Sequence, residues 1–184
     1  DIIVSKLPAG FDVLPGNGDL TAAEVELLDA ENPQSRLASA LKGVAANYDV
    51  VLIDCPPSLN MLTVNALTAA DGVLIPLQCE FYALEGLSAL LDTVEQIKES
   101  VNPQLAVSGI LRTMYDKRTS LTREVDKQLR ECFGDALLKA TIPRNIKVAE
   151  APSHGMPVTK YARLSRGSQS YRVLAKELIK RLSL

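Results

Sequence analysis

The sequence of 184 residues contains no tryptophan, three phenylalanines and five tyrosines, so a folded core must be built mainly from Leu, Val, Ile and Ala. It has one histidine and three cysteines, Cys55, Cys79 and Cys132, with no CxxC pair. This scarcity excludes most structural zinc sites, which need four ligands that usually come in close pairs. An odd number of widely spaced cysteines favours free thiols in a reducing cytoplasm.

Long hydrophobic runs are also missing. No apolar stretch approaches the roughly 18 residues that a membrane-spanning helix needs, and residues 1–6 lack the basic and apolar regions of a secretory signal. A composition of 47% hydrophobic and 23% charged residues is ordinary for a globular protein. The length predicts a single domain over residues 1–184. The free thiols favour a cytoplasmic location.

The charge is divided unevenly along the chain. Residues 1–97 carry three basic and fourteen acidic side chains, a net charge of −11, whereas residues 98–184 carry seventeen basic and eight acidic ones, a net charge of +9. A half this basic indicates a polyanionic partner. The alternative is a solvated surface whose charges pair within the fold.

Apolar patterns predict strands that alternate with helices. Strands are expected at 11–14, 48–54, 72–77, 105–114 and 137–142, and helices at 19–29, from 32 onward, and at 60–70, 83–100, 119–133 and 168–182. This order indicates the α/β class, with a three-layer, mostly parallel sheet and helices on both faces. Ligands of such folds bind at the carboxyl ends of the strands, which here carry Asp54, residues 114–118 and residues 143–145.

The sharpest motif is VLIDCPPS at residues 51–58, where Asp54 follows an apolar run. A run without polar alternation is typical of a strand buried on both faces. A carboxylate at the end of such a strand is how P-loop NTPases hold Mg²⁺, usually through a water molecule. The alternative for Asp54 is a cap on the following helix.

Four longer blocks resemble one protein family in the same order. They cover residues 50–91, 109–125 (GILRTMYDKRTSLTREV), 142–158 (IPRNIKVAEAPSHGMPV) and 164–178 (LSRGSQSYRVLAKEL). From residue 11 to the C-terminus the sequence resembles the ParA/Soj chromosome- and plasmid-partitioning ATPases, relatives of MinD within the deviant P-loop class. The resemblance implies a P-loop NTPase-like fold, of which this chain is the C-terminal portion.

The resemblance also implies a nucleotide site. Asp54 would be the catalytic carboxylate that holds Mg²⁺ through water beside ATP. Pro143 would offer the adenine a rigid apolar surface, Asn145 a donor and an acceptor, and Met114 a soft apolar wall. Without the resemblance, Pro143 is a strand terminator and Asn145 a helix cap.

A second implication is non-specific DNA binding. The family's DNA-binding positions are occupied here by Arg118 and Lys147. Arg is common at the position of Lys147, so the positive charge is kept but the planar guanidinium, which can bind two phosphate oxygens, is lost. We interpret Arg123, Lys127 and Arg130 as a solvated helix face. The family further implies a homodimer formed on ATP binding, a ParB-type partner protein that stimulates hydrolysis, and association with the nucleoid.

One expected motif is missing. No GxxxxGK[ST] occurs in the sequence, and the family places this phosphate-binding loop upstream of the blocks found here. We therefore expect the chain by itself to lack the family's Mg·ATP hydrolase activity and to lack the family's first strand.

Two other functions stay open. The C-terminal segment has Tyr171, Leu174, Leu178 and Leu182 at helical spacing among basic residues, a pattern that would suit a MinD-like positioning ATPase lying on a membrane. The alternative is a helix that packs on the sheet and exposes its basic face to solvent. The chain could also be a non-enzymatic fragment that binds DNA or a partner. His154 is interpreted as a loop residue.

Overall fold

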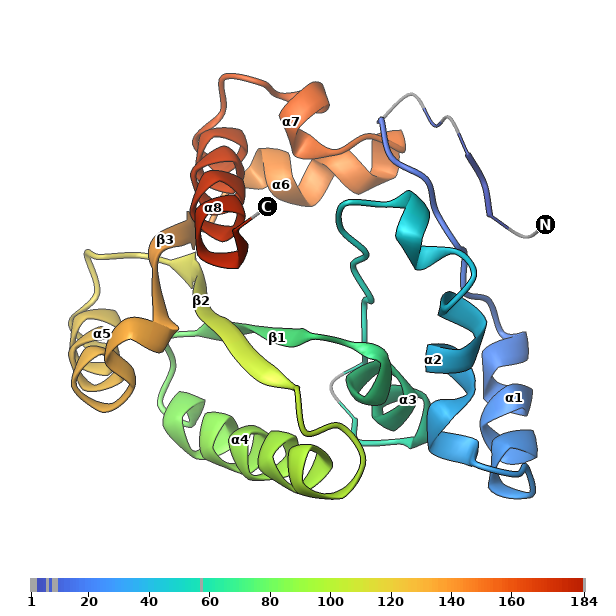
Figure 1. The fold of residues 1–184 in the computed structure, drawn as a ribbon. Helices are drawn as coiled ribbons and strands as arrows, with labels where there is room; N and C mark the ends of the chain where they lie inside the picture. The colour runs from blue at the N-terminus through green and yellow to red at the C-terminus, as the bar shows by residue number, and fades with distance from the viewer. Residues whose placement is uncertain (1–2, 6, 8–9, 57, 184) are drawn as a thin grey trace. The chain divides into compact units, whose positions relative to one another are not determined.

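The computed structural model describes residues 3–5, 7, 10–56 and 58–183, and the chain divides into two compact units (Figure 1). The first unit comprises residues 1–73 and 92–106, and the second unit comprises residues 74–91 and 107–184. The expectation of one domain stays a prediction.

The first unit is built on three helices that lie side by side, α1 (Asp19–Leu28), α2 (Arg36–Leu41) and α3 (Met61–Ala69) (Figure 1). Asn65 of α3 is buried, and its amide joins the helices: its Oδ1 accepts the Leu37 amide at 3.1 Å and its Nδ2 donates to the Pro33 carbonyl at 2.8 Å. Asn60 caps α3 by accepting the Thr63 amide at 2.9 Å. The helices begin and end close to the predicted positions.

The predicted strand at 48–54 is wrong. Within the described residues this segment forms no strand and pairs with none, and Leu52 is 86% exposed. Apolar residues form a strand only when a neighbouring strand completes their hydrogen bonds, and none is present there. The strand predicted at 11–14 is reduced to one bridge between Val13 and Val4, and Pro57 lies outside the described residues.

Most of the sheet lies in the second unit. Among the described residues, β1 (Gly72–Gln78), β2 (Ala106–Tyr115) and β3 (Leu137–Pro143) form a three-stranded sheet in the order β1-β2-β3, with β2 and β3 parallel. The main helices that follow these strands are α4 (Ala83–Ser100), α5 (Ser120–Phe133) and α8 (Arg166–Leu182), and two short helices, α6 (Ile146–Glu150) and α7 (Val158–Tyr161), precede α8. The expected α/β class with parallel strands is confirmed.

The helices α5 and α8 cover opposite faces of β2 and β3. Leu111 belongs to a buried cluster with Leu138 of β3 and Leu174 of α8. The next residue, Arg112, points to the other face, where it pairs with Asp126 of α5. Since neighbouring side chains of a strand point to opposite faces, α8 and α5 lie on the two sides of the sheet (Figure 1).

The pairing of β2 with β3 is interrupted twice. Between the pairs Ile110–Leu137 and Arg112–Thr141, β3 has two more residues than β2. Side chains complete the backbone hydrogen bonds of this bulge. The Arg112 guanidinium donates to the carbonyls of residues 138 and 139, and the Glu177 carboxylate accepts the amides of residues 139 and 140, each at 2.7 Å.

The second interruption is in β2, next to the candidate site. Between the pairs Arg112–Thr141 and Tyr115–Pro143, β2 has one residue more than β3. Met114 lies in this bulge with φ of 47°, a left-handed conformation that is uncommon for a residue other than glycine. Bulges often occur next to functional sites, where they change the direction of a side chain. Met114 is the residue in this position here.

Candidate functional site

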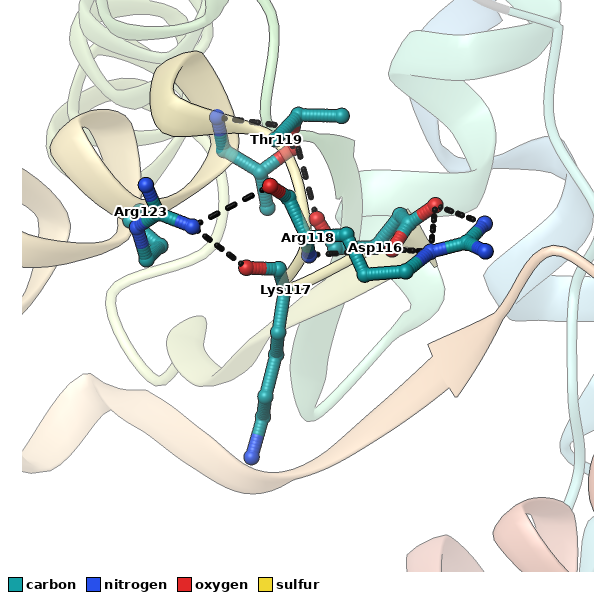
Figure 2. Close-up of polar contacts among 6 residues, drawn as sticks. Asp116, Lys117, Arg118, Thr119 and Arg123 are labelled. Carbon is teal, nitrogen blue, oxygen red and sulfur yellow. Dashed lines mark hydrogen bonds and ion pairs between the residues drawn. The ribbon is translucent and has the colours of Figure 1, made fainter.

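The loop that connects β2 to α5 is organised by its own polar groups (Figure 2). Thr119 caps α5: its hydroxyl oxygen accepts the Thr122 amide at 3.3 Å and donates to the Asp116 carbonyl, also at 3.3 Å. Arg123, one turn into α5, donates to the backbone carbonyls of Lys117 and Arg118 at 3.0 and 3.1 Å. Residues 116–119 are therefore held by α5 and not left as a loose connection.

Asp116 and Arg118 form an exposed ion pair within this loop (Figure 2). The Arg118 Nε donates to Asp116 Oδ1 at 2.9 Å, an Nη donates to Oδ2 at 2.6 Å, and the Arg118 amide donates to Oδ1 at 3.0 Å. These hydrogen bonds, helped by the nearby charge of Arg144, lower the pKa of Asp116 from 3.8 to about 2. Asp116 belongs to residues 114–118, which the sequence places at the ligand edge, but it was given no role of its own, although its place two residues before Arg118 was a visible signal.

The basic residues of α5 are exposed and paired within the chain. Lys127 lies 3.8 Å from Glu131, and Arg130 lies 3.0 Å from Asp126. Arg123 was interpreted as part of a solvated helix face. It is exposed, but its guanidinium also holds the loop through hydrogen bonds to two backbone carbonyls. In Figure 2 the side chain of Lys117 extends away from the Asp116–Arg118 pair.

A cavity of about 340 Å³ opens at the carboxyl ends of β1 and β2, within the second unit. Its lining includes Cys79, Glu80, Met114, Asp116, Thr119 and Arg144. Met114 is about half exposed, and Pro143 is the pairing partner of the next residue, Tyr115. The structure thus brings Met114 and Pro143 to the same edge of the sheet, as the sequence predicted.

Asn145 lies two residues after Pro143 and is the N-cap residue of α6. Its backbone carbonyl accepts the Val148 amide at 3.1 Å, but its side chain makes no capping hydrogen bond. The side-chain Oδ1 is buried, and among the described residues no donor lies within hydrogen-bond distance of it. A buried acceptor without a partner is costly, and here the oxygen lies against Gly167 at the start of α8.

Gly167, at the start of α8, leaves room for the side chains of Asn145 and Val148. A Cβ at Gly167 would lie 3.1 Å from Asn145 Oδ1 and 2.3 Å from a methyl carbon of Val148. The start of α8 and the start of α6 therefore approach closely, and the absence of a side chain at Gly167 makes this possible.

Lys147 lies on α6 in a surface cluster. Its Nζ donates to Glu150 Oε2 at 2.8 Å and lies 5.7 Å from the centre of the Tyr161 ring. The Tyr161 hydroxyl also donates to Glu150 Oε2, at 3.1 Å, and His154 stacks on the Tyr161 ring with centroids 4.6 Å apart. The hydrogen bond to Glu150 raises the pKa of Lys147, and the same bond, followed by that of Tyr161, lowers the pKa of Glu150.

Asp54 lies in the first unit, in the exposed segment that lacks strand structure. Its neighbour Cys55 is exposed, and partial desolvation followed by the charge of Asp54 raises the pKa of the Cys55 thiol. Because Met114, Pro143 and Asn145 belong to the second unit, their predicted grouping with Asp54 stays a prediction.

The last helix packs on the sheet. Leu174 is buried against β2 and β3, and Leu178 adds to the same cluster, so this side of α8 is occupied. Arg181 near the end of α8 donates to the carbonyl of Ser108 at 3.2 Å and to that of Asp135 at 2.7 Å. Across the described residues, no helix is long and apolar enough to cross a membrane.

Comparison with known proteins places these features in a family. The sequence profile of the AAA domain matches residues 1–107. The chain is 51% identical over 181 residues to the chromosome partitioning protein ParA of Caulobacter vibrioides, covering 97% of this chain and 67% of that protein. It is 48% identical to the sporulation initiation inhibitor protein Soj of Bacillus subtilis, covering 97% of this chain and 70% of Soj. The chain belongs to the ParA/Soj family.

The fold of this ParA/Soj chain is shared with a solved structure. Cobyrinic acid a,c-diamide synthase from Mycobacterium smegmatis superposes with a TM-score of 0.82 at 35% identity, over 98% of this chain and 66% of that one. That synthase has also been crystallised with an ATP analogue and magnesium. The ParA/Soj chain spans 65% of the length of a 57% identical relative from Pseudomonas putida, so it corresponds to about two thirds of such a protein.

Proposed function

We propose that this chain is part of a chromosome or plasmid partitioning protein that binds Mg·ATP, dimerises on ATP binding and binds DNA without sequence preference. The observation that carries the proposal is the 51% identity with Caulobacter ParA over nearly the whole chain. The basic second half of the sequence supports a polyanionic partner.

The adenine would be held by residues of the second unit. Met114 and Pro143 would contact the adenine from the ends of β2 and β3, and the amide of Asn145 would offer it a donor and an acceptor. Asp54 would hold Mg²⁺ through water and act in hydrolysis. Bound Mg·ATP supplies the phosphoryl group for hydrolysis, and the protein's part in such chemistry is mainly positioning and electrostatic stabilisation.

DNA would be bound by Arg118 and Lys147. Arg118 follows β2 with 90% of its side chain exposed, and Lys147 lies on α6, which follows β3, with half of its side chain exposed. Exposed cations that reach phosphate oxygens give affinity without reading the bases. Two protomers joined on ATP binding would present both cations twice, and a ParB-type partner would stimulate hydrolysis and release the DNA. Such a protein would be found in the cytoplasm, on the nucleoid.

The Arg118→Ala variant tests the DNA-binding role. Loss of one phosphate contact should weaken binding to short duplexes of unrelated sequence by a similar factor and reduce the salt slope by about 1. Lys127→Ala is the control, because Lys127 is also a largely exposed cation that pairs with a carboxylate of the chain, and it should leave binding unchanged. A salt slope and affinity unaltered by Arg118→Ala would argue against this role.

The nucleotide role is tested separately with Asn145→Ala. This variant removes the amide that would pair with the adenine and should weaken the binding of a fluorescent ATP analogue, while Arg118→Ala should leave that affinity unchanged. Equal nucleotide affinity in the Asn145→Ala variant and the unaltered protein would contradict the adenine assignment.

A further inference from the structure

Both cations that would contact DNA are already paired with a carboxylate of the same chain. Arg118 is bound by Asp116, two residues earlier, through contacts of 2.6, 2.9 and 3.1 Å. Lys147 is bound by Glu150, three residues later, at 2.8 Å. Each pair has no net charge, so neither position offers DNA an isolated positive charge.

The Asp116 carboxylate occupies the donors that a phosphate would use. It takes Nε and one Nη of Arg118, which together form the planar fork that binds two oxygens of a carboxylate or a phosphate. At the other position, Glu150 takes one of the three hydrogens of the Lys147 ammonium group and also accepts from Tyr161. Tyr161 thereby holds Glu150 in place beside Lys147.

We propose that Asp116 and Glu150 set the affinity of the DNA-binding surface by competing with DNA phosphates for Arg118 and Lys147. The inference rests on the proposed DNA-binding function. A phosphate has to displace each carboxylate from its cation, or bind beside it against its negative charge. Either route weakens each single contact, so that stable binding depends on several copies of the site acting together on one DNA molecule.

The geometry suggests variants that remove the competing charge and keep the local fold. Asp116→Asn retains the side-chain oxygen that accepts the Arg118 amide at 3.0 Å. Glu150→Gln retains a side-chain oxygen that can accept from the Tyr161 hydroxyl, which donates to Glu150 Oε2 at 3.1 Å in the unaltered protein. Each variant should tighten binding of a short DNA duplex about two- to five-fold, the range of an exposed ion pair, as measured by fluorescence anisotropy with Mg·ATP at fixed salt.

Glu95→Gln controls for the change in total charge. Glu95 is an exposed carboxylate three residues before Lys98, with the pair 3.5 Å apart on α4, so it matches the Glu150–Lys147 pair in type and spacing. This variant should leave DNA affinity unchanged. A gain equal to that of Asp116→Asn would overturn the inference, because overall charge would then explain it.

A double-mutant cycle tests whether the effect passes through the paired cation. The gain from Asp116→Asn should vanish in the Arg118→Ala background, and the gain from Glu150→Gln should vanish in the Lys147→Ala background. A gain that persists there, or the absence of a gain from either carboxylate variant alone, overturns the inference. Failure of Arg118→Ala and Lys147→Ala themselves to weaken binding would instead remove the proposed DNA-binding function.

Discussion

Arg112 of β2 forms an ion pair with Asp126 of α5, and its side chain has no exposed surface. The same guanidinium lies 5.5 Å from the centre of the Tyr115 ring and donates to the carbonyls of β3 at its bulge. One side chain therefore joins β2, β3 and α5, three residues before β2 ends at Tyr115. A buried cation is tolerated in this position because its charge and most of its hydrogens are matched.

Arg112→Met should destabilise the protein by up to about 3–5 kcal/mol, since two carbonyls lose their donor and the mostly buried carboxylate of Asp126 keeps the exposed Arg130 but loses its buried cation. Urea unfolding followed by circular dichroism measures the loss. The double variant Arg112→Met with Asp126→Leu should recover part of it, because it also removes the mostly buried charge that has lost its buried partner. A double variant less stable than Arg112→Met would contradict this account.

Gly167→Ala should destabilise the protein by about 1–3 kcal/mol through overpacking. The new Cβ would lie 2.3 Å from Val148, whose branched side chain cannot easily move aside. The control is Gly86→Ala, on α4, where a Cβ would meet nothing within 4 Å. That substitution should stabilise the helix by roughly 0.5–1 kcal/mol, so thermal unfolding should shift in opposite directions for the two variants.

Leu174→Ala should cost about 2–5 kcal/mol, because Leu174 is 6% exposed in the cluster between α8 and the sheet. The adjacent Val173 is 55% exposed, and Val173→Ala should change stability by no more than about 0.5 kcal/mol. Chemical denaturation of the two variants checks this difference. Similar losses would mean that α8 does not pack as described.

Asp116 should titrate near pH 2, which carboxyl carbon chemical shifts can measure. Its pKa is lowered chiefly by the hydrogen bonds from Arg118, so the ion pair is fully formed above the unfolded value of 3.8 and is lost as the pH falls through about 2. Across the physiological range the pair should show no pH dependence. In Arg118→Ala the midpoint should move back toward 3.8, and an unmoved midpoint would contradict the assigned cause.

Part of the candidate site could be predicted from local sequence. Met114 and Pro143 were expected at the carboxyl ends of parallel strands, and the pairing of Tyr115 with Pro143 confirms that they share an edge. The ion pairs of Asp116 and Glu150 were missed, although Asp-x-Arg and Lys-x-x-Glu spacings place opposite charges within reach of each other. The proposed roles of Arg118, Lys147, Asn145 and Asp54 are open to the tests given above.

The sequence by itself determined most helices and the strands β1, β2 and β3, because their apolar patterns and caps act between neighbouring residues. It also indicated the ParA/Soj family. It failed at residues 48–54, since a strand depends on a partner that the pattern of the segment does not contain. Only the tertiary structure decided that Arg112 and Glu177 complete the bulge of β3 and that Met114 adopts a left-handed conformation. Those features arise from the register between strands and from a helix far along the chain, which no local pattern records.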